Sequence, residues 1–155
     1  MPIWVDADAC PQVVRTIIIK AALRTGTTTT FIANRPTPLP PSPLLISRQV
    51  AAGFDVADNA IVEAAGPGDL VITADIPLAA EAIDKGATVL TFRGESLTAA
   101  NVRARLNMRD FLETMRSSGI QSGGPAPFDQ RDRKAFADAL DRWLGQTQML
   151  QNPKR

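Results

Sequence analysis

The chain has 155 residues, 45% of them hydrophobic, which suffices for one domain with a buried core and excludes wholesale disorder. Lys and Arg number 17 against 16 Asp and Glu, and the resulting net charge of +1 excludes a strongly basic nucleic-acid coat protein. One cysteine excludes an internal disulfide and a Cys-cluster zinc site, and the absence of histidine excludes Ser-His-Asp catalysis, Cys-His catalysis and His-bound zinc.

Apolar runs and turn residues in the N-terminal half predict alternating strands and helices. We expect a strand at residues 2–5, a helix at 10–26 and a second strand at 27–33. Residues 44–51 form a third strand or a short helix, and residues 55–65 form a helix capped by Asp55. The run Ile17–Ile19 is too short to span a bilayer, and the chain opens on a strand instead of a signal peptide. We therefore expect a cytoplasmic protein with no membrane partner.

The second half continues the alternation and then becomes helical. A strand, a helix and a strand are expected at residues 70–72, 77–85 and 87–92. Helix-spaced apolar stripes at Met108–Met115 and Phe136–Leu144 flank a Gly/Pro-rich loop at 119–127. The fold class expected is α/β: one domain over residues 1–145, with a mainly parallel sheet flanked by helices on both faces, a helical C-terminal part, and a frayed polar tail over residues 146–155.

Aspartates follow two of the predicted strands directly. Asp6 and Asp8 come after the first strand, and Asp75 comes after the strand at 70–72. Asp58 lies in the first turn of the helix that precedes the latter strand. Open α/β sheets bind ligands at the carboxyl ends of strands, where the strand order reverses. We therefore expect Asp6, Asp8 and Asp75 at one rim, with Asp58 reaching in from the side.

Clustered carboxylates repel one another unless they share protons, pair with cations or bind a metal. With no histidine and one cysteine, the ligands are hard oxygens, which favours Mg²⁺ or Mn²⁺ over zinc. A metal held in this way can generate hydroxide from water and neutralise phosphate oxygens, which suits phosphodiester hydrolysis. Simpler roles compete, because capping alone would explain Asp8 and Asp55, and a turn would explain Asp69.

Three long segments, at residues 4–11, 51–59 and 68–79, resemble the bacterial YaiI/YqxD family of uncharacterised proteins. Met108–Phe111 and Ser122–Pro125 also resemble that family, so the match extends over residues 1 to about 145. The family is regarded as PIN-like. The resemblance therefore implies a three-layer α/β fold whose acidic residues bind Mg²⁺ or Mn²⁺ and cleave RNA.

The resemblance also implies roles for individual acids. Asp6 is similar to the acidic residue that follows the first strand in PIN domains. Asp58, which lies three residues before Ile61, is similar to the acidic residue in their middle helix. Asp75, in Thr73-Ala74-Asp75, is similar to the later acid. The role of Asp8 stays open, and the step from a PIN-like fold to nuclease activity is an analogy of fold.

These observations favour a divalent-metal-dependent nuclease or phosphodiesterase acting on RNA or another phosphodiester. Catalysis is assigned to Asp6, Asp58 and Asp75, and the metal ligands are these three together with Asp8. The residues expected to bind substrate are Asn59, Thr73 and Arg93, and Arg48 and Arg109 are further candidates for phosphate contact. The oligomeric state stays open.

Two alternatives remain open. One is a non-catalytic module that binds RNA or a protein partner through the basic C-terminal helices. The other is a phosphatase of the haloacid-dehalogenase type, with Asp6 and Asp8 as nucleophile and acid, Thr73 as the phosphate-binding hydroxyl and Lys85 as its lysine.

Overall fold

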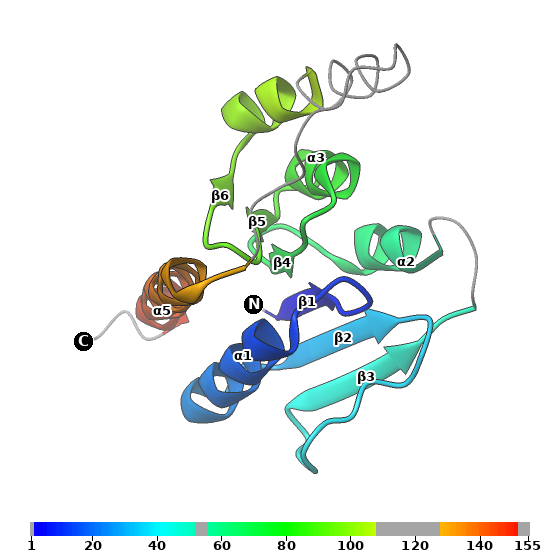
Figure 1. Ribbon diagram of the computed structural model, residues 1–155, viewed down its shortest axis with the longest axis vertical. Coiled ribbons are helices and arrows are strands. Elements are labelled where there is room, and N and C mark those ends of the chain that lie inside the picture. Colours follow the sequence, from blue (N-terminus) through cyan, green and yellow to red (C-terminus); the bar gives the residue numbers. More distant parts are fainter. Residues whose placement is uncertain (1, 52–55, 108–127, 152–155) are drawn as a thin grey trace.

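A computed structural model describes residues 2–51, 56–107 and 128–151 (Figure 1). Its strands are β1 Ile3–Asp6, β2 Thr29–Ala33, β3 Leu45–Gln49, β4 Leu70–Ile72, β5 Thr88–Leu90 and β6 Ser96–Leu97. Its helices are α1 Gln12–Thr25, α2 Val56–Ala64, α3 Ile76–Asp84 and α5 Gln130–Gln151, and residues 99–107 are also helical. None of the helices in this part of the chain is both long and apolar enough to cross a bilayer.

The strands form one sheet in the order β3-β2-β1-β4-β5-β6. Neighbouring strands run parallel, apart from β6, which pairs antiparallel with β5. Val5 of β1 lies opposite Phe31 of β2 on one side and Ile72 of β4 on the other. The expected α/β fold with a mainly parallel sheet is therefore confirmed, and the strand order reverses between β1 and β4.

Two apolar layers cover the sheet. On one face, α1 and α5 pack together, and on the other lie α2 and α3 (Figure 1). The α5 residues Phe136, Leu140 and Leu144 are at most 2% exposed and belong to the first layer, which confirms the apolar stripe predicted there. Burying each such side chain contributes roughly 1.5–3 kcal/mol. The helix is therefore firmly attached to the sheet.

A close backbone contact fixes the start of α5. Gly94 lies in the turn between β5 and β6 with φ +84°, a conformation that favours glycine. A Cβ there would stand 2.4 Å from the carbonyl carbon of Ala135. The turn and the helix therefore meet backbone to backbone, at a distance that only glycine permits.

Three expectations need adjustment. Residues 44–51, ambiguous in sequence, contain a strand, because β3 pairs with β2. After Gly94 the chain forms β6 before it turns helical at residue 99. The tail predicted to begin at 146 is helical as far as Gln151, since α5 continues to that residue; Thr147 of this helix is buried, and its Oγ1 donates to the carbonyl oxygen of Trp143. The Asp55 cap, the 108–115 stripe and the 119–127 loop lie outside the described residues.

Candidate functional site

The carboxyl ends of β1 and β4 lie side by side. Val5 pairs with Ile72, so Asp6 at the end of β1 adjoins Thr73, the residue after β4. The strand order reverses here, which leaves the crevice where open α/β sheets bind ligands. The adjacency predicted for the first strand and the 70–72 strand is confirmed.

The hydroxyl of Thr73 joins two of the predicted site residues. Its Oγ1 donates to Asp6 Oδ2 over 2.9 Å and accepts the backbone N–H of Asp75 over 3.0 Å. Thr73 is fully buried and Asp6 is 7% exposed. Thr73 therefore holds Asp6 in place, and these bonds occupy the hydroxyl that was assigned to substrate.

Asp75 caps helix α3. Its Oδ1 accepts the backbone N–H of Leu78 over 3.0 Å, and Pro77 occupies the first turn of the helix. The cap uses one carboxylate oxygen of a half-buried side chain. The other oxygen is the one with which Asp75 can act at the edge of the sheet.

Asp8 has a tethering role. Its side chain is exposed, and its Oδ2 accepts the backbone N–H of Asn34 over 2.9 Å. This bond fastens the loop after β1 to the residue that follows β2. Helix α1 begins after Pro11 with no side-chain hydrogen bond at its cap, so the capping role considered for Asp8 is wrong.

The surroundings of Asp6 shift its pKa. Burial raises its pKa above the ordinary value, the hydrogen bond from Thr73 opposes the rise, and the charges of Asp75 and Asp8 add to it. Within residues 2–51, 56–107 and 128–151, no Lys or Arg forms an ion pair with any of the three carboxylates. The edge therefore concentrates negative charge that a cation would stabilise.

The donors at this edge fit a cation held by few protein ligands. Among the described residues, no three Cys, Asp or Glu side chains form a group that could hold a metal ion. Asp6 and Asp75 nevertheless share Thr73, and Mg²⁺ is usually bound by one or two carboxylates together with water and substrate phosphates. The residues present fit Mg²⁺ or Mn²⁺ in that mode and do not form a preassembled carboxylate cage.

Asp58 comes from a different element, helix α2. It lies half-buried in the first turn of α2, next to the exposed Asn59. Helix α2 leads from β3 back to the start of β4, so its first turn lies toward the edge that holds Asp6. Asp58 is not one of the two carboxylates whose charges raise the pKa of Asp6. The charges that act on Asp6 are therefore those of Asp75 and Asp8.

A cleft of about 660 Å³ adjoins Asp75. It is lined by Pro11, Ala74, Ile76, Thr91, Phe92, Arg93, Glu95, Arg105 and Phe128. Arg93 donates to Asp132 Oδ2 of α5 over 2.7 Å, and Arg105 pairs with Glu95. Arg93 therefore faces the cleft, as a substrate contact must, while tied to α5. Sequence reasoning missed Phe92, Arg105 and Phe128, because they belong to separate elements with no shared motif.

Lys85, the lysine of the phosphatase alternative, lies at the other edge of the sheet. Its Nζ donates to the carbonyl oxygens of Val62 and Glu63 at the end of α2. Lys85 also ends α3, just before β5 begins. The lysine therefore cannot act beside Asp6, which removes one of the four residues on which that alternative depends.

The fold and this edge define an α/β protein with carboxylates at the switch point of a mainly parallel sheet. The chain belongs to the YaiI/YqxD family of uncharacterised bacterial proteins, whose model matches residues 4–146. The UPF0178 proteins of Shewanella amazonensis and Thioalkalivibrio sulfidiphilus are each 62% identical over 144 residues, or 93% of this chain and 97% and 98% of theirs. The UPF0178 protein of Proteus mirabilis is 60% identical over 93% of this chain and 95% of its own. No solved structure matches significantly.

Proposed function

We propose that the protein is a divalent-metal-dependent hydrolase of phosphodiesters, with RNA as its expected substrate. The observation that carries the proposal is the Asp6–Thr73–Asp75 link at the β1/β4 switch point, where Thr73 joins the Asp6 carboxylate to the backbone N–H of Asp75, the charge of Asp75 acts on Asp6, and neither carboxylate forms an ion pair among the described residues. The PIN-like resemblance of the sequence supports the same chemistry as an analogy of fold.

In this proposal Asp6 and Asp75 hold Mg²⁺ or Mn²⁺, which when bound supplies an activated water and neutralises phosphate oxygens. Thr73 orients Asp6 by its hydrogen bond, and the α3 cap orients Asp75. Carboxylates held by buried or backbone partners keep their geometry without reorganisation, as catalysis requires.

The other predicted residues take outer positions. Asp8 adds negative charge from the loop after β1, where it could ligate the metal directly or through water. Asp58 and Asn59, in the first turn of α2, approach the substrate or its water from the side. Arg93 lies in the cleft beside Asp75 and supplies positive charge for a phosphate group.

The metal assignment can be tested by calorimetric titration of the wild type and of Asp75→Asn with Mn²⁺. Asparagine caps a helix about as well as aspartate, so this variant removes the charge and keeps the cap. We expect Mn²⁺ affinity to be lost. Glu81→Gln is the matched control, because Glu81 is exposed on the same helix. Undiminished Mn²⁺ affinity in Asp75→Asn would overturn the proposal.

A companion assay follows cleavage of a labelled single-stranded RNA with Mn²⁺ and with EDTA. Cleavage that requires Mn²⁺ and is lost in Asp75→Asn supports the hydrolase. RNA binding without turnover in any divalent metal would instead favour the non-catalytic module.

A further inference from the structure

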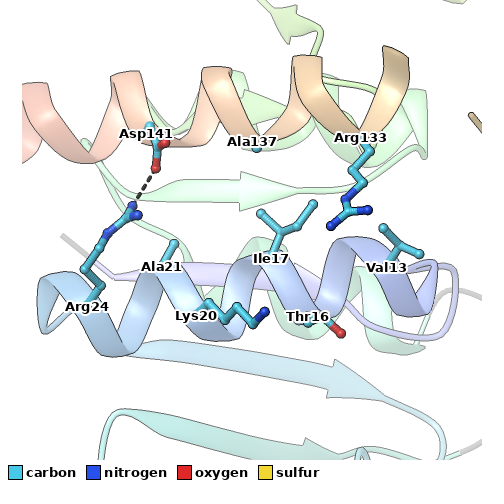
Figure 2. Close-up of a pocket in the computed structure, with 9 residues that line it drawn as sticks. All are labelled: Val13, Thr16, Ile17, Lys20, Ala21, Arg24, Arg133, Ala137 and Asp141. Carbon is cyan, nitrogen blue, oxygen red and sulfur yellow. Dashed lines mark hydrogen bonds and ion pairs between the residues drawn. The ribbon is translucent and has the colours of Figure 1, made fainter. Parts of the chain in front are cut away.

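A second hollow lies between α1 and α5 (Figure 2). These helices cover the face of the sheet opposite α2 and α3 (Figure 1). We call the hollow the α1/α5 groove. It has a volume of about 350 Å³ and is lined by Val13, Thr16, Ile17, Lys20, Ala21, Arg24, Arg133, Ala137 and Asp141. Figure 2 shows Arg24 meeting Asp141 across the groove and Arg133 reaching from α5 toward α1, while Lys20 lies along α1. The groove therefore combines aliphatic side chains with charged ones.

Positive charge predominates in the groove. Arg24 pairs with Asp141 across it, with Nη2 and Oδ1 2.6 Å apart and both side chains more than half exposed. Lys20 and Arg133 are exposed and have no ion-pair partner within the described parts of the chain. The groove therefore keeps two cations for a ligand, and a third cation that a stronger anion could take from Asp141.

The groove begins next to the cleft at the candidate site. Pro11 lines the cleft and Val13 lines the groove, two residues apart at the start of α1. Near the start of α5, Phe128 lines the cleft and Arg133 lines the groove. At about 1.5 Å per residue, α1 carries the groove roughly 16 Å from Val13 to Arg24. That length matches about five nucleotides of a stacked strand at about 3.4 Å each.

We propose that the α1/α5 groove binds the backbone phosphates of a single-stranded nucleic acid whose scissile bond lies at Asp6 and Asp75. This inference rests on the proposed function for the position of the scissile bond. The phosphates pair with Lys20 and Arg133, and sugar carbons pack on aliphatic side chains such as Ile17. A recess between two packed helices admits one strand, whereas a duplex would touch only its rims.

The first test measures the anisotropy of a labelled 12-nucleotide RNA, and of the matching DNA, in EDTA over a range of salt concentrations. The variant is Lys20→Gln/Arg133→Gln. Each lost phosphate contact lowers the salt slope by about 0.7, so we expect a decrease of about 1.4 and roughly 10- to 30-fold weaker binding near 0.1 M salt. If the variant loses affinity for the RNA alone, the groove accepts ribose. If it loses affinity for both the RNA and the DNA, the groove accepts either sugar.

Arg103→Gln/Lys134→Gln is the charge-matched control. Both residues are exposed and neither lines the groove, and Lys134 is on α5 next to Arg133. This control must bind more tightly than the groove variant. Equal affinities and salt slopes in the two double variants would overturn the proposal, because the effect would then be one of net charge.

Asp141→Asn gives a change in the opposite direction. Removal of this carboxylate releases Arg24 for a phosphate, so we expect tighter binding and a salt slope steeper by about 0.7. Unchanged or weaker binding would count against the groove as the contact surface.

A final comparison separates this proposal from that for the hydrolase. A dinucleotide is too short to reach from Asp75 into the groove, so Lys20→Gln/Arg133→Gln should cleave it as the wild type does and show a raised KM for the 12-mer alone. Because binding is measured in EDTA, it does not depend on the metal site. Asp75→Asn can therefore refute the hydrolase while the groove result stands, and the reverse also holds.

Discussion

Two aspartates, one at the amino ends of the parallel strands and one at their carboxyl ends, are almost equally buried and have different surroundings. Asp69, before β4, is 9% exposed, and its Oδ2 accepts both the backbone N–H of Gly66 and the indole Nε1–H of Trp4. Asp6, at the end of β1, is 7% exposed, accepts one hydrogen bond from Thr73 and faces two further carboxylates. Burial alone does not mark a functional acid. Asp6 differs in that two further carboxylates act on it and no Lys or Arg of the described segments pairs with it.

The largest expected effect concerns chemistry at the Asp6 edge. Asp6→Asn should reduce Mn²⁺-dependent cleavage of single-stranded RNA by about 10³-fold, because metal stabilisation of the transition state is worth several kcal/mol. Single-turnover rates at saturating Mn²⁺ measure this effect. Asp84→Asn, on the exposed surface of α3, serves as the control. Cleavage at the wild-type rate would place the reaction elsewhere.

At the other edge, Asp69→Ala should destabilise the fold and leave the metal site intact. The Gly66 N–H and the Trp4 indole would lose their acceptor, at a cost of about 2–4 kcal/mol in unfolding free energy. Urea unfolding followed by tryptophan fluorescence measures the loss, and Mn²⁺ titration of the folded variant should match the wild type. If Mn²⁺ affinity fell as far as in Asp75→Asn, the contrast between the two edges would fail.

Asp6→Asn should also stabilise the metal-free protein at neutral pH. Because the folded-state pKa of Asp6 lies above its unfolded value, the contribution of this group to stability is greatest at low pH and is lost as the pH rises through the folded pKa. The unfolding free energy of the variant should therefore exceed that of the wild type by on the order of 1 kcal/mol at pH 7. This difference should vanish below about pH 4. Thermal unfolding in EDTA at several pH values measures this trend, and a constant difference would contradict it.

The smallest effect separates the two roles of Asp75. Asp75→Asn and Asp75→Ala should both lose Mn²⁺, but only alanine removes the acceptor for the Leu78 N–H and costs about 1 kcal/mol of stability. Denaturant unfolding of the two variants side by side measures the difference. Equal stabilities would show that the cap contributes nothing, and would leave the metal assignment to the titration.

Sequence reasoning predicted the part of the fold that patterned residues specify. The apolar runs of β1 and β4 and the aspartates beyond them sufficed to place Asp6 beside the end of β4, because parallel strands align their carboxyl ends. β3 stayed ambiguous because four of its five residues are exposed at the edge of the sheet, so it shows no clear alternation.

Contacts between distant segments could not be predicted in this way. The Arg24–Asp141 ion pair joins residues 117 positions apart, and no local pattern links them. The two-residue strand β6 depends on the Gly94 turn and is too short to leave a periodic signal. The bonds that hold Asp6 and Asp75 through the Thr73 hydroxyl likewise became visible only once the strands were paired.

The segment that enters α5 borders both hollows, because Phe128, two residues before the helix, lines the cleft and Arg133, in the first turn of α5, lines the α1/α5 groove. The Gly94 turn meets Ala135, and Arg93 beside it donates to Asp132, so two contacts attach the first turns of α5 to the loop that borders the cleft. The same turns carry Arg133 into the groove (Figure 2). In the proposed complex, a strand in the groove contacts the same helix that these two contacts attach to the loop beside the cleft, so the proposal predicts that substrate length affects the cleft.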